Sequence, residues 1–256
     1  MFQLYRLSSP SCYTRAVNII LFDALNAINS LPFEDYRAQH IRKVLRLGVG
    51  DRFTAGIVNG ERGEARILSM TGERLSFSFL GAGEPPPPLH PVTLLVAQVR
   101  PISMRRILRE AVSLGAARIV LVATDTGEKS YSQAKLYESG EYRLILIDGA
   151  MQSGSTGVSE VHFADSVEDA IRNFGGDGEH IVLDNRRSGE ALSAMTIQAG
   201  SAVVLAIGGE RGFSDRERDV YAANGFRFAT LGSRTLRTET AVSAGLAVLL
   251  GRMGLL

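Results

Sequence analysis

The length, composition and charge of this chain exclude several classes of protein. With 256 residues, of which 45% are hydrophobic, it can bury a sizeable core and form one large or two modest domains. Its single cysteine, Cys12, excludes a disulfide framework and a cysteine metal site, and its four histidines lack ligand spacing, so no metal is expected. The net charge of +1 limits any nucleic-acid surface to a local patch.

Membrane and targeting segments are not expected either. The apolar runs are too short to span a membrane. The first residues do not combine a basic region with a sustained apolar stretch, as a signal peptide would. We therefore expect a cytoplasmic protein with no membrane partner.

The residue pattern of 1–84 is typical of a small β-domain. Strand-like runs are expected at about 52–58, 64–68 and 74–80. The Asn59-Gly60 pair between the first two runs is a strong hairpin signal. The pattern predicts a small β-barrel or sandwich, preceded by a short helical turn near residues 40–47.

This first region also carries a local excess of positive charge. Residues 1–52 contain seven Lys or Arg against four Asp or Glu. Arg42, Lys43 and Arg46 follow one another along the expected helical turn. They form either an ordinary solvated face or a patch that binds RNA phosphates, and charge alone leaves both open.

Residues 85–91 form the expected boundary between two domains. The segment contains Pro85 to Pro88 and Pro91, and consecutive prolines favour a stiff, extended linker.

From residue 92 to residue 256 the pattern becomes alternating strand and helix. Such alternation predicts a mostly parallel sheet with helices on both faces. Strands are expected at about 92–99, 119–122, 161–163, 181–184, 202–207 and 226–231. Helices are expected at about 104–112, 133–151, 167–174 and 190–195, after Ser214, and at 238–253.

Two strand-to-loop-to-helix junctions are the strongest candidates for a site, at residues 207–214 and 231–241. In parallel sheets ligands bind where such loops leave the carboxyl ends of the strands. Gly208, Gly209 and Gly212 allow a ligand to approach the backbone, although a tight turn alone would also explain them. They fit neither the dinucleotide fingerprint nor a phosphate loop. Ser214 and Glu217 predict a capping box.

Taken together, the two junctions resemble those of the RsmE-type SPOUT methyltransferases, a family that methylates N3 of a uridine in 16S ribosomal RNA. The second junction matches the family form Leu-Gly-x-Arg-x-Leu-Arg-Thr-Glu-Thr-Ala throughout. The first usually reads Ile-Gly-Pro-Glu-Gly-Gly-Phe, and here Gly209 replaces the proline and Arg211 a glycine. Ser113 and Ser155 replace an acid and an arginine that the family usually carries.

The resemblance implies a fold, a cofactor and partners. It implies an N-terminal PUA-like RNA-binding barrel at 1–84 and a SPOUT domain with a deep trefoil knot at 92–256. It implies S-adenosylmethionine as cofactor, 16S rRNA in the small ribosomal subunit as substrate, and a homodimer built on the knotted region. The last helix is apolar on most of its surface, and burial within one subunit would also explain that.

The resemblance also assigns candidate site residues. Arg237 would stabilise the uracil anion that forms at N3, unless it makes a helix-start salt bridge with Glu239. Glu210 would orient the cofactor or relay a proton. The RNA-binding candidates are Arg6, Arg42, Lys43, Arg46 and Arg105. The cofactor-binding candidates are Leu183, Ile207, Gly208, Gly209, Glu210, Gly212, Leu231, Gly232, Leu236, Arg237, Thr238, Thr240 and Ala241.

Other classes of function stay open at this point. A methyltransferase acting on a different RNA site would keep every motif above. A non-catalytic RNA-binding relic of the fold would keep the basic patches but bind no cofactor. A nicotinamide oxidoreductase would share the alternating pattern, but the chain lacks its glycine fingerprint.

Overall fold

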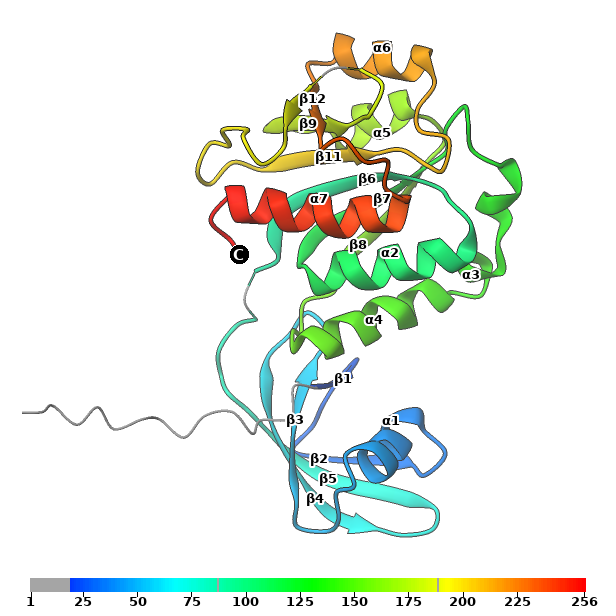
Figure 1. Cartoon of the computed structure of the whole chain (residues 1–256). Coiled ribbons are helices and arrows are strands. Elements are labelled where there is room, and N and C mark those ends of the chain that lie inside the picture. Colours follow the sequence, from blue (N-terminus) through cyan, green and yellow to red (C-terminus); the bar gives the residue numbers. More distant parts are fainter. Residues whose placement is uncertain (1–18, 87, 188) are drawn as a thin grey trace, which may run out of the picture.

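The computed structural model describes residues 19–86, 88–187 and 189–256, and it contains two sheets, one above the other in Figure 1. Arg6 lies outside the described residues. The smaller sheet has five strands in the order β1-β3-β4-β5-β2. Its strands are β1 (Ile20–Phe22), β2 (Ile28–Pro32), β3 (Arg52–Ile57), β4 (Arg62–Met70) and β5 (Arg74–Gly81).

The hairpin and the helical turn predicted in this domain are both present. β3 and β4 pair antiparallel across the Asn59-Gly60 turn, where Asn59 has a φ of 54°. The helical segment consists of α1 (Tyr36–Gln39) and a π-helical turn, His40–Val44. The strands β1 and β2 were not expected from the sequence, because neither shows a sustained alternation of apolar and polar residues.

The larger sheet has seven strands in the order β10-β12-β9-β11-β6-β7-β8. All six neighbouring pairs are parallel. The strands are β6 (His90–Ala97), β7 (Ala116–Val122), β8 (Glu160–Ala164), β9 (Glu179–Leu183), β10 (Glu190–Ala191), β11 (Val203–Ile207) and β12 (Arg227–Thr230). The predicted parallel α/β sheet is therefore confirmed, and the knot stays a prediction.

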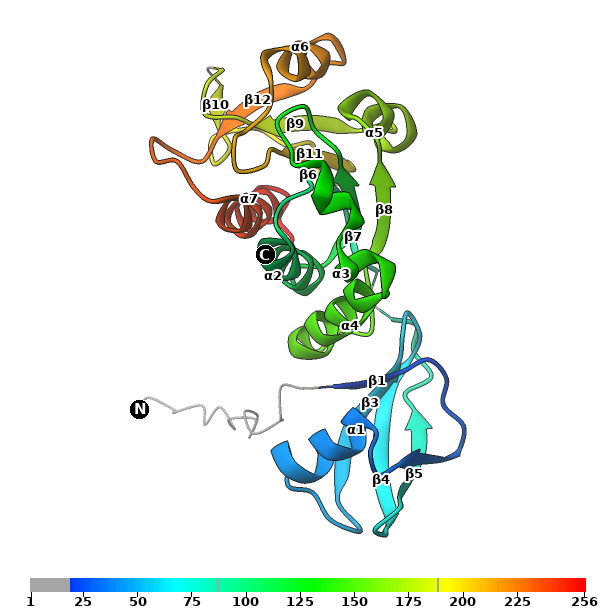
Figure 2. The ribbon, with the colours of Figure 1, turned by 90° about the vertical axis from the view of Figure 1, so that its right-hand side faces the viewer.

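Helices cover both faces of this sheet, as predicted (Figure 2). Buried side chains of one face pack with α2 (Pro101–Ser113), α4 (Glu141–Ser153) and α7 (Thr238–Arg252). Those of the other face pack with α5 (Val167–Phe174) and α6 (Asp215–Ala223). Successive residues of a strand point to opposite faces, so Leu94 lies in the first cluster and Leu95 in the second.

The predictions for two helices are wrong. The segment 133–151 is not one helix but a 3-10 turn (Lys129–Gln133), α3 (Lys135–Glu138) and α4. Gly140 separates the last two in a left-handed conformation, with φ 73°. Residues 190–195 form the two-residue strand β10 and a turn, because Glu190 and Ala191 pair with β12 at the sheet edge.

The two domains are joined by the linker and by further contacts. The chain passes from Gly81, the end of β5, to His90, the start of β6, and the proline-rich segment lies between. Among the further contacts, the tip of the β3–β4 hairpin contacts the loop after α4. The Asn59 N–H donates to the Thr156 carbonyl at 2.8 Å, and Asn59 Oδ1 accepts from the Val158 N–H at 2.7 Å. The domain limits at residues 84 and 92 stay a prediction.

No helix in the described ranges is long and apolar enough to cross a bilayer.

Candidate functional site

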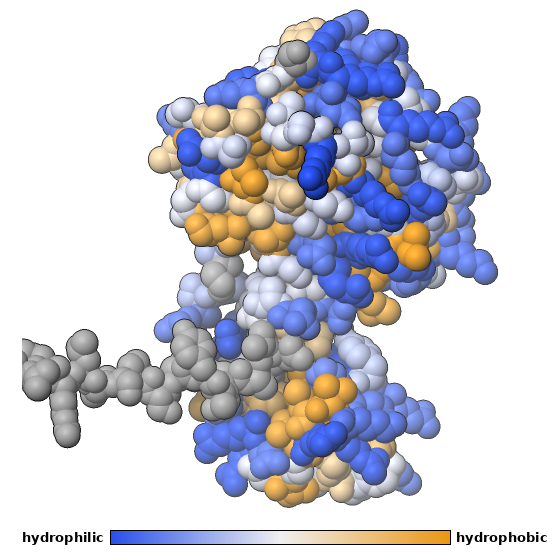
Figure 3. Space-filling view, viewed as in Figure 1, coloured by the Kyte–Doolittle hydropathy of each residue, from blue (hydrophilic) through white to orange (hydrophobic). Residues whose placement is uncertain are grey.

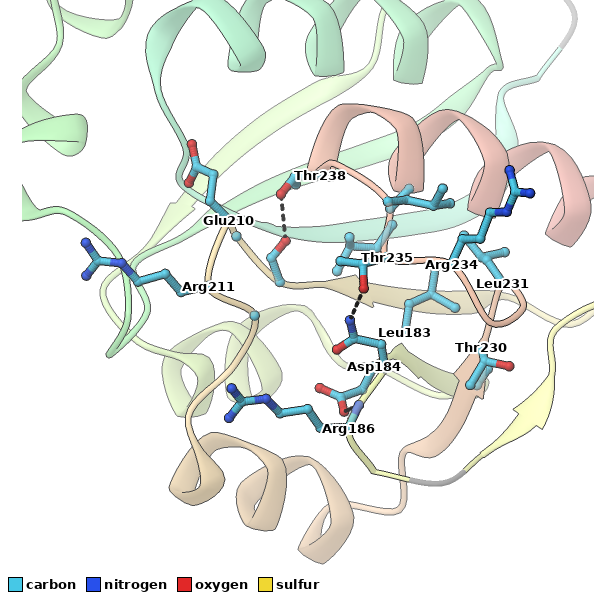
Figure 4. Close-up of a pocket in the computed structure, with 18 of the residues that line it drawn as sticks. Leu183, Asp184, Arg186, Glu210, Arg211, Thr230, Leu231, Arg234, Thr235 and Thr238 are labelled. Carbon is cyan, nitrogen blue, oxygen red and sulfur yellow. Dashed lines mark hydrogen bonds between the residues drawn. The ribbon is translucent and has the colours of Figure 1, made fainter.

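A cavity of about 530 Å³ lies at the carboxyl ends of three adjacent strands, β9, β11 and β12 (Figure 4). Each strand supplies one wall. The residues that line the cavity come from the loop after β9 (Leu183, Asp184, Asn185, Arg186), the loop after β11 (Ile207, Gly208, Gly209, Glu210, Arg211, Gly212), and β12 with the segment that leads into α7 (Ala229, Thr230, Leu231, Gly232, Arg234, Thr235, Leu236, Thr238, Ala241).

The loop after β9 is shaped by the side chain of Asp184. Its Oδ1 accepts from the N–H groups of Arg186 and Arg187, both at 2.7 Å. An aspartate that accepts from the backbone two and three residues on closes a local turn. This turn directs Asn185 and Arg186 to the pocket.

The loop after β11, residues 208–212, is called the glycine turn below. Its ends approach so closely that a Cβ on Gly208 would lie 3.0 Å from the Cα of Gly212. Gly212 has a φ of 67°, whereas Gly209 is not among the glycines with positive φ. The turn therefore requires glycine at positions 208 and 212, and an L-residue fits the backbone at 209.

Neighbouring elements hold the glycine turn from outside. Thr126, in the loop after β7, donates from Oγ1 to the Gly212 carbonyl at 2.6 Å. Glu210 accepts from Arg100 Nε at 3.2 Å, and Arg211 lies 3.7 Å from Glu128. The turn ends at Ser214, whose capping box with Glu217 is present as predicted and starts α6.

Hydrogen bonds also join the three walls to one another. Thr238 Oγ1 donates to the Gly208 carbonyl at 3.2 Å, and Asn185 Nδ2 donates to Thr235 Oγ1 at 3.3 Å (Figure 4). Gly232 has a φ of 102°, with nothing within 4 Å of the position of a Cβ. Its backbone conformation, not space, demands glycine there.

Electrostatics fix the start of α6 beside the pocket. The guanidinium of Arg216, and next the hydroxyl of Ser214, hold the pKa of Asp125 below its usual range. The Asp125 N–H in turn donates to Glu217 Oε1 at 2.9 Å. The loop after β7 is thus fastened to the helix that follows the glycine turn.

Most of the predicted cofactor-binding residues line the cavity. Eleven of the thirteen do so, and the two that do not are Arg237 and Thr240. Arg237 is exposed and occupies the N-cap position of α7. Among the described residues, Arg237 makes no ion pair with Glu239, which instead lies 3.7 Å from Arg106.

Sequence reasoning missed several lining residues, among them Asp184, Asn185, Arg186 and Thr235. A signal existed for the first two, because Asp184 ends an expected strand and Asn185 directly follows it, where parallel sheets bind ligands. Arg186, Arg234 and Arg237 leave exposed positive charge around the pocket, and none has an ion-pair partner among the residues described.

The predicted RNA-binding residues lie on different elements. Arg42, Lys43 and Arg46 are exposed on the smaller domain, and the Arg42 guanidinium lies 4.9 Å from the Phe33 ring centroid. Arg105, on α2, donates to both carboxylate oxygens of Glu141, at 2.8 and 2.9 Å. Its charge is therefore largely neutralised. No cluster of three or more potential metal ligands occurs in the described part of the chain.

The fold and the pocket define a class of protein, the RNA methyltransferases with a PUA domain. The RNA methyltransferase domain family matches residues 85–250, and the RNA methyltransferase PUA domain family matches residues 33–80. The first match alone covers more than half of the chain.

Relatives narrow the class. The chain is 37% identical over 246 residues to ribosomal RNA small subunit methyltransferase E of Treponema pallidum, covering 91% of each chain. It is 27% identical over 228 residues to ribosomal RNA small subunit methyltransferase E 1 of Borreliella burgdorferi, covering 89% of this chain and 95% of that one. The chain belongs to the ribosomal RNA small subunit methyltransferase E family, the RsmE type of SPOUT protein.

A solved structure shares the whole fold. The enzyme of this name from Neisseria gonorrhoeae, solved bound to S-adenosylmethionine, superposes with a TM-score of 0.75. The match covers 92% of this chain and 97% of that chain, at 22% identity. The arrangement of two domains is therefore that of the family.

Proposed function

We propose that this chain transfers a methyl group from S-adenosylmethionine to N3 of a uridine in the 16S rRNA of the small ribosomal subunit. Membership of the family supports the reaction, and the cofactor in the Neisseria structure supports the ligand. The observation that carries the proposal is the pocket, which unites the two junctions singled out in the sequence and is large enough for a nucleoside cofactor.

The residues present fit this cofactor. Leu183, Leu231 and Leu236 give the pocket apolar surface for an adenine ring, and Asn185 and the glycine turn give polar groups. At Gly208 a side chain would collide with the turn, so bare backbone faces the ligand there. We propose that the eleven predicted residues that line the pocket, with Asn185 and Thr235, hold the cofactor.

The cofactor supplies an electrophilic methyl group. The protein must align the uracil and stabilise the negative charge that N3 gains as its proton leaves. Arg237 suits the second task, because its side chain is exposed beside the pocket and has no ion-pair partner among the described residues. The target base must be unpaired when it reacts, since N3 lies on its Watson–Crick edge.

Glu210 is proposed to orient groups at the pocket rim. Arg100 approaches its carboxylate with both Nε, at 3.2 Å, and its backbone N–H, at 3.5 Å. A carboxylate held by a guanidinium on the rim is better placed to fix a neighbouring group than to move freely toward a substrate.

RNA is proposed to contact both domains. Arg42, Lys43 and Arg46 would bind phosphates, which supply affinity without sequence readout. Arg105 could join them only by leaving Glu141. At the pocket, Arg186 and Arg234 have no ion-pair partner among the described residues, and their charges favour an anionic partner (Figure 4).

We further propose a cytoplasmic homodimer. Apolar side chains gather over α7 on the face shown in Figure 3. Ala244, Ala247 and Val248 of this helix are only partly buried within one chain. Sedimentation at micromolar concentration should give a species near twice 27.6 kDa, and a single species at 27.6 kDa would contradict the dimer.

Two measurements test the proposed function. Methyl transfer to small ribosomal subunits from cells lacking this gene, read by mass spectrometry of the 16S rRNA, should place the new methyl group on N3 of one uridine. A methyl group elsewhere would identify a different RNA site. Calorimetry showing no binding of S-adenosylmethionine would instead favour a non-catalytic relic.

A further inference from the structure

One ion pair behind the pocket differs from every other in the described ranges. Arg218 of α6 donates from Nε to Asp184 Oδ2 at 2.9 Å, and the two side chains are 4% and 2% exposed. No other ion pair of the described residues has both side chains below 10% exposed. It is a fully buried charge pair, whereas each other ion pair of the described residues has at least one side chain that is partly exposed.

Hydrogen bonds join α6 to the loop after β9, and each of the two elements donates to the other. Asp184 accepts from Arg218 with one oxygen and from the Arg186 and Arg187 N–H groups with the other. Arg187 reaches back, donating from Nη1 to the Arg218 carbonyl at 3.0 Å and from Nη2 to Asp219 at 2.6 Å. The loop that forms one wall of the pocket is therefore tied to α6.

The same guanidinium lies against the opposite wall. Arg218 Nη1 donates to Asp215 at 2.8 Å, while Nη2 is buried without a hydrogen-bond partner among the described residues. A Cβ built on Gly212 would lie 3.6 Å from this Nη2. The planar guanidinium thus fills the space between Asp184 and the glycine turn, from behind the pocket.

Burial of such a pair is not needed for stability. Well-packed apolar residues in place of a buried ion pair usually leave a fold as stable or make it more stable, because both charges lose their hydration. The buried donor Nη2 adds a further cost. Unlike an apolar contact, the ion pair fixes the relative orientation of the two side chains, because a planar guanidinium binds in one orientation.

We propose that Arg218 is a positioning residue that sets the separation between the Asp184–Arg186 wall and the glycine turn of the cofactor pocket. The inference rests on the proposed function, in which this pocket holds S-adenosylmethionine. Arg218 does not line the pocket and acts through Asp184 and Gly212.

Three variants separate positioning from charge neutralisation. Arg218→Met leaves the Asp184 carboxylate buried and unpaired. Asp184→Asn combined with Arg218→Met removes both charges but keeps an oxygen for the Arg186 and Arg187 N–H groups. Arg227→Met is the matched control. Arg227 pairs with Glu179 at 2.5 Å, at the ends of β12 and β9 that lie away from the pocket.

The first readout needs no ligand. Amide hydrogen exchange of residues 185–187 and 209–212 should become at least about tenfold faster in Arg218→Met and stay fast in the double variant, at a temperature where both are folded. In Arg227→Met these amides should exchange as in the unaltered protein. Unchanged exchange in both walls of the double variant would overturn the proposal.

The second readout is the dissociation constant of S-adenosylmethionine by calorimetry. It should rise about tenfold or more in Arg218→Met, which corresponds to about 1.4 kcal/mol. The double variant should regain its melting temperature but not its affinity, and Arg218→Lys should regain affinity only in part. If the double variant regains both, Arg218 only neutralises Asp184 and the proposal is wrong. If the unaltered protein binds no cofactor, the proposed function fails, while the exchange result still decides whether Arg218 holds the two walls.

Discussion

The two junctions that build the pocket are held in opposite ways. The segment 231–241 matches the family pattern throughout, yet residues 232–235 are exposed and few contacts hold them. The glycine turn departs from the pattern at Gly209 and Arg211, yet Thr126, Arg100 and Glu128 hold it from outside. The exposed junction therefore depends mainly on its own backbone conformation, whereas the glycine turn is also held by neighbouring elements.

The largest effect should come from the exposed junction. Arg237→Ala should lower turnover by about a hundred- to a thousandfold, or about 3 to 4 kcal/mol, because a preorganised donor to a developing anion is lost. Cofactor affinity and melting temperature should stay within error, since Arg237 has no ion-pair partner among the described residues. Methyl transfer to small subunits, calorimetry and thermal unfolding measure the three quantities.

Arg172→Ala is the control for this variant, because Arg172 is likewise exposed but lies on α5. It should leave turnover unchanged. Near-normal turnover in folded Arg237→Ala would exclude the catalytic role, and a joint loss of stability and affinity would make Arg237 structural.

The next effect concerns Gly232, in the same junction. Gly232→Val forces a β-branched residue to a φ of 102° and should cost about 1 to 3 kcal/mol of strain. Because the strain falls in the pocket, the dissociation constant of S-adenosylmethionine should rise about tenfold or more.

Gly225→Val is a matched control, since Gly225 has a φ of 76°, has equally open space around it, and precedes β12 outside the pocket. Both variants should melt at lower temperature. Equal affinities in the two variants would show that Gly232 serves the fold and not the ligand.

A smaller effect should follow from loosening the glycine turn. Thr126→Val removes the hydroxyl that donates to the Gly212 carbonyl, a hydrogen bond of about 1 kcal/mol, and should weaken cofactor binding about fivefold. The control is Thr124→Val, because the Thr124 hydroxyl is buried without a partner in the described ranges and its loss should cost nothing. If both variants bind alike in calorimetry, the glycine turn does not depend on the loop after β7.

The smallest effect should appear as a dependence of stability on pH. Arg216 and Ser214 lower the pKa of folded Asp125, so its ionised form adds stability above its unfolded pKa, about 3.9. That contribution disappears as pH falls through the lower folded pKa. The melting temperature of Asp125→Asn should therefore lie below that of the unaltered protein at pH 7, and the gap should begin to narrow near pH 4 and close below the folded pKa. A gap independent of pH would assign the effect to neutral hydrogen bonds.

The sequence predicted those features that depend on nearby residues. The capping box of Ser214 and Glu217 and the Asn59 turn were both predicted and are present, because each is set by contacts over three or four positions. The parallel sheet followed from the alternation of apolar strands and amphipathic helices, and buried apolar clusters do lie on both of its faces.

Features that depend on distant residues were not predicted. The pairing of Asp184 with Arg218 joins residues 34 positions apart, and no local pattern marks either. The break at Gly140 was missed because apolar spacing continues on both sides of it. Arg186 and Thr235 reach the pocket only because two separate loops leave neighbouring strands on the same side.

The contact between the Asn59 hairpin tip and the loop at Thr156 limits how far the two domains can move relative to each other. A domain joined to another by one linker can swing, whereas here a second attachment at the hairpin resists rotation. The two attachments therefore hold the distance between the pocket and Arg42, Lys43 and Arg46 fixed. Under the proposed function, an RNA would have to place its reactive uridine in the pocket and its backbone at these three residues at that spacing. We therefore expect a folded ribosomal subunit to be a better substrate than a short flexible strand.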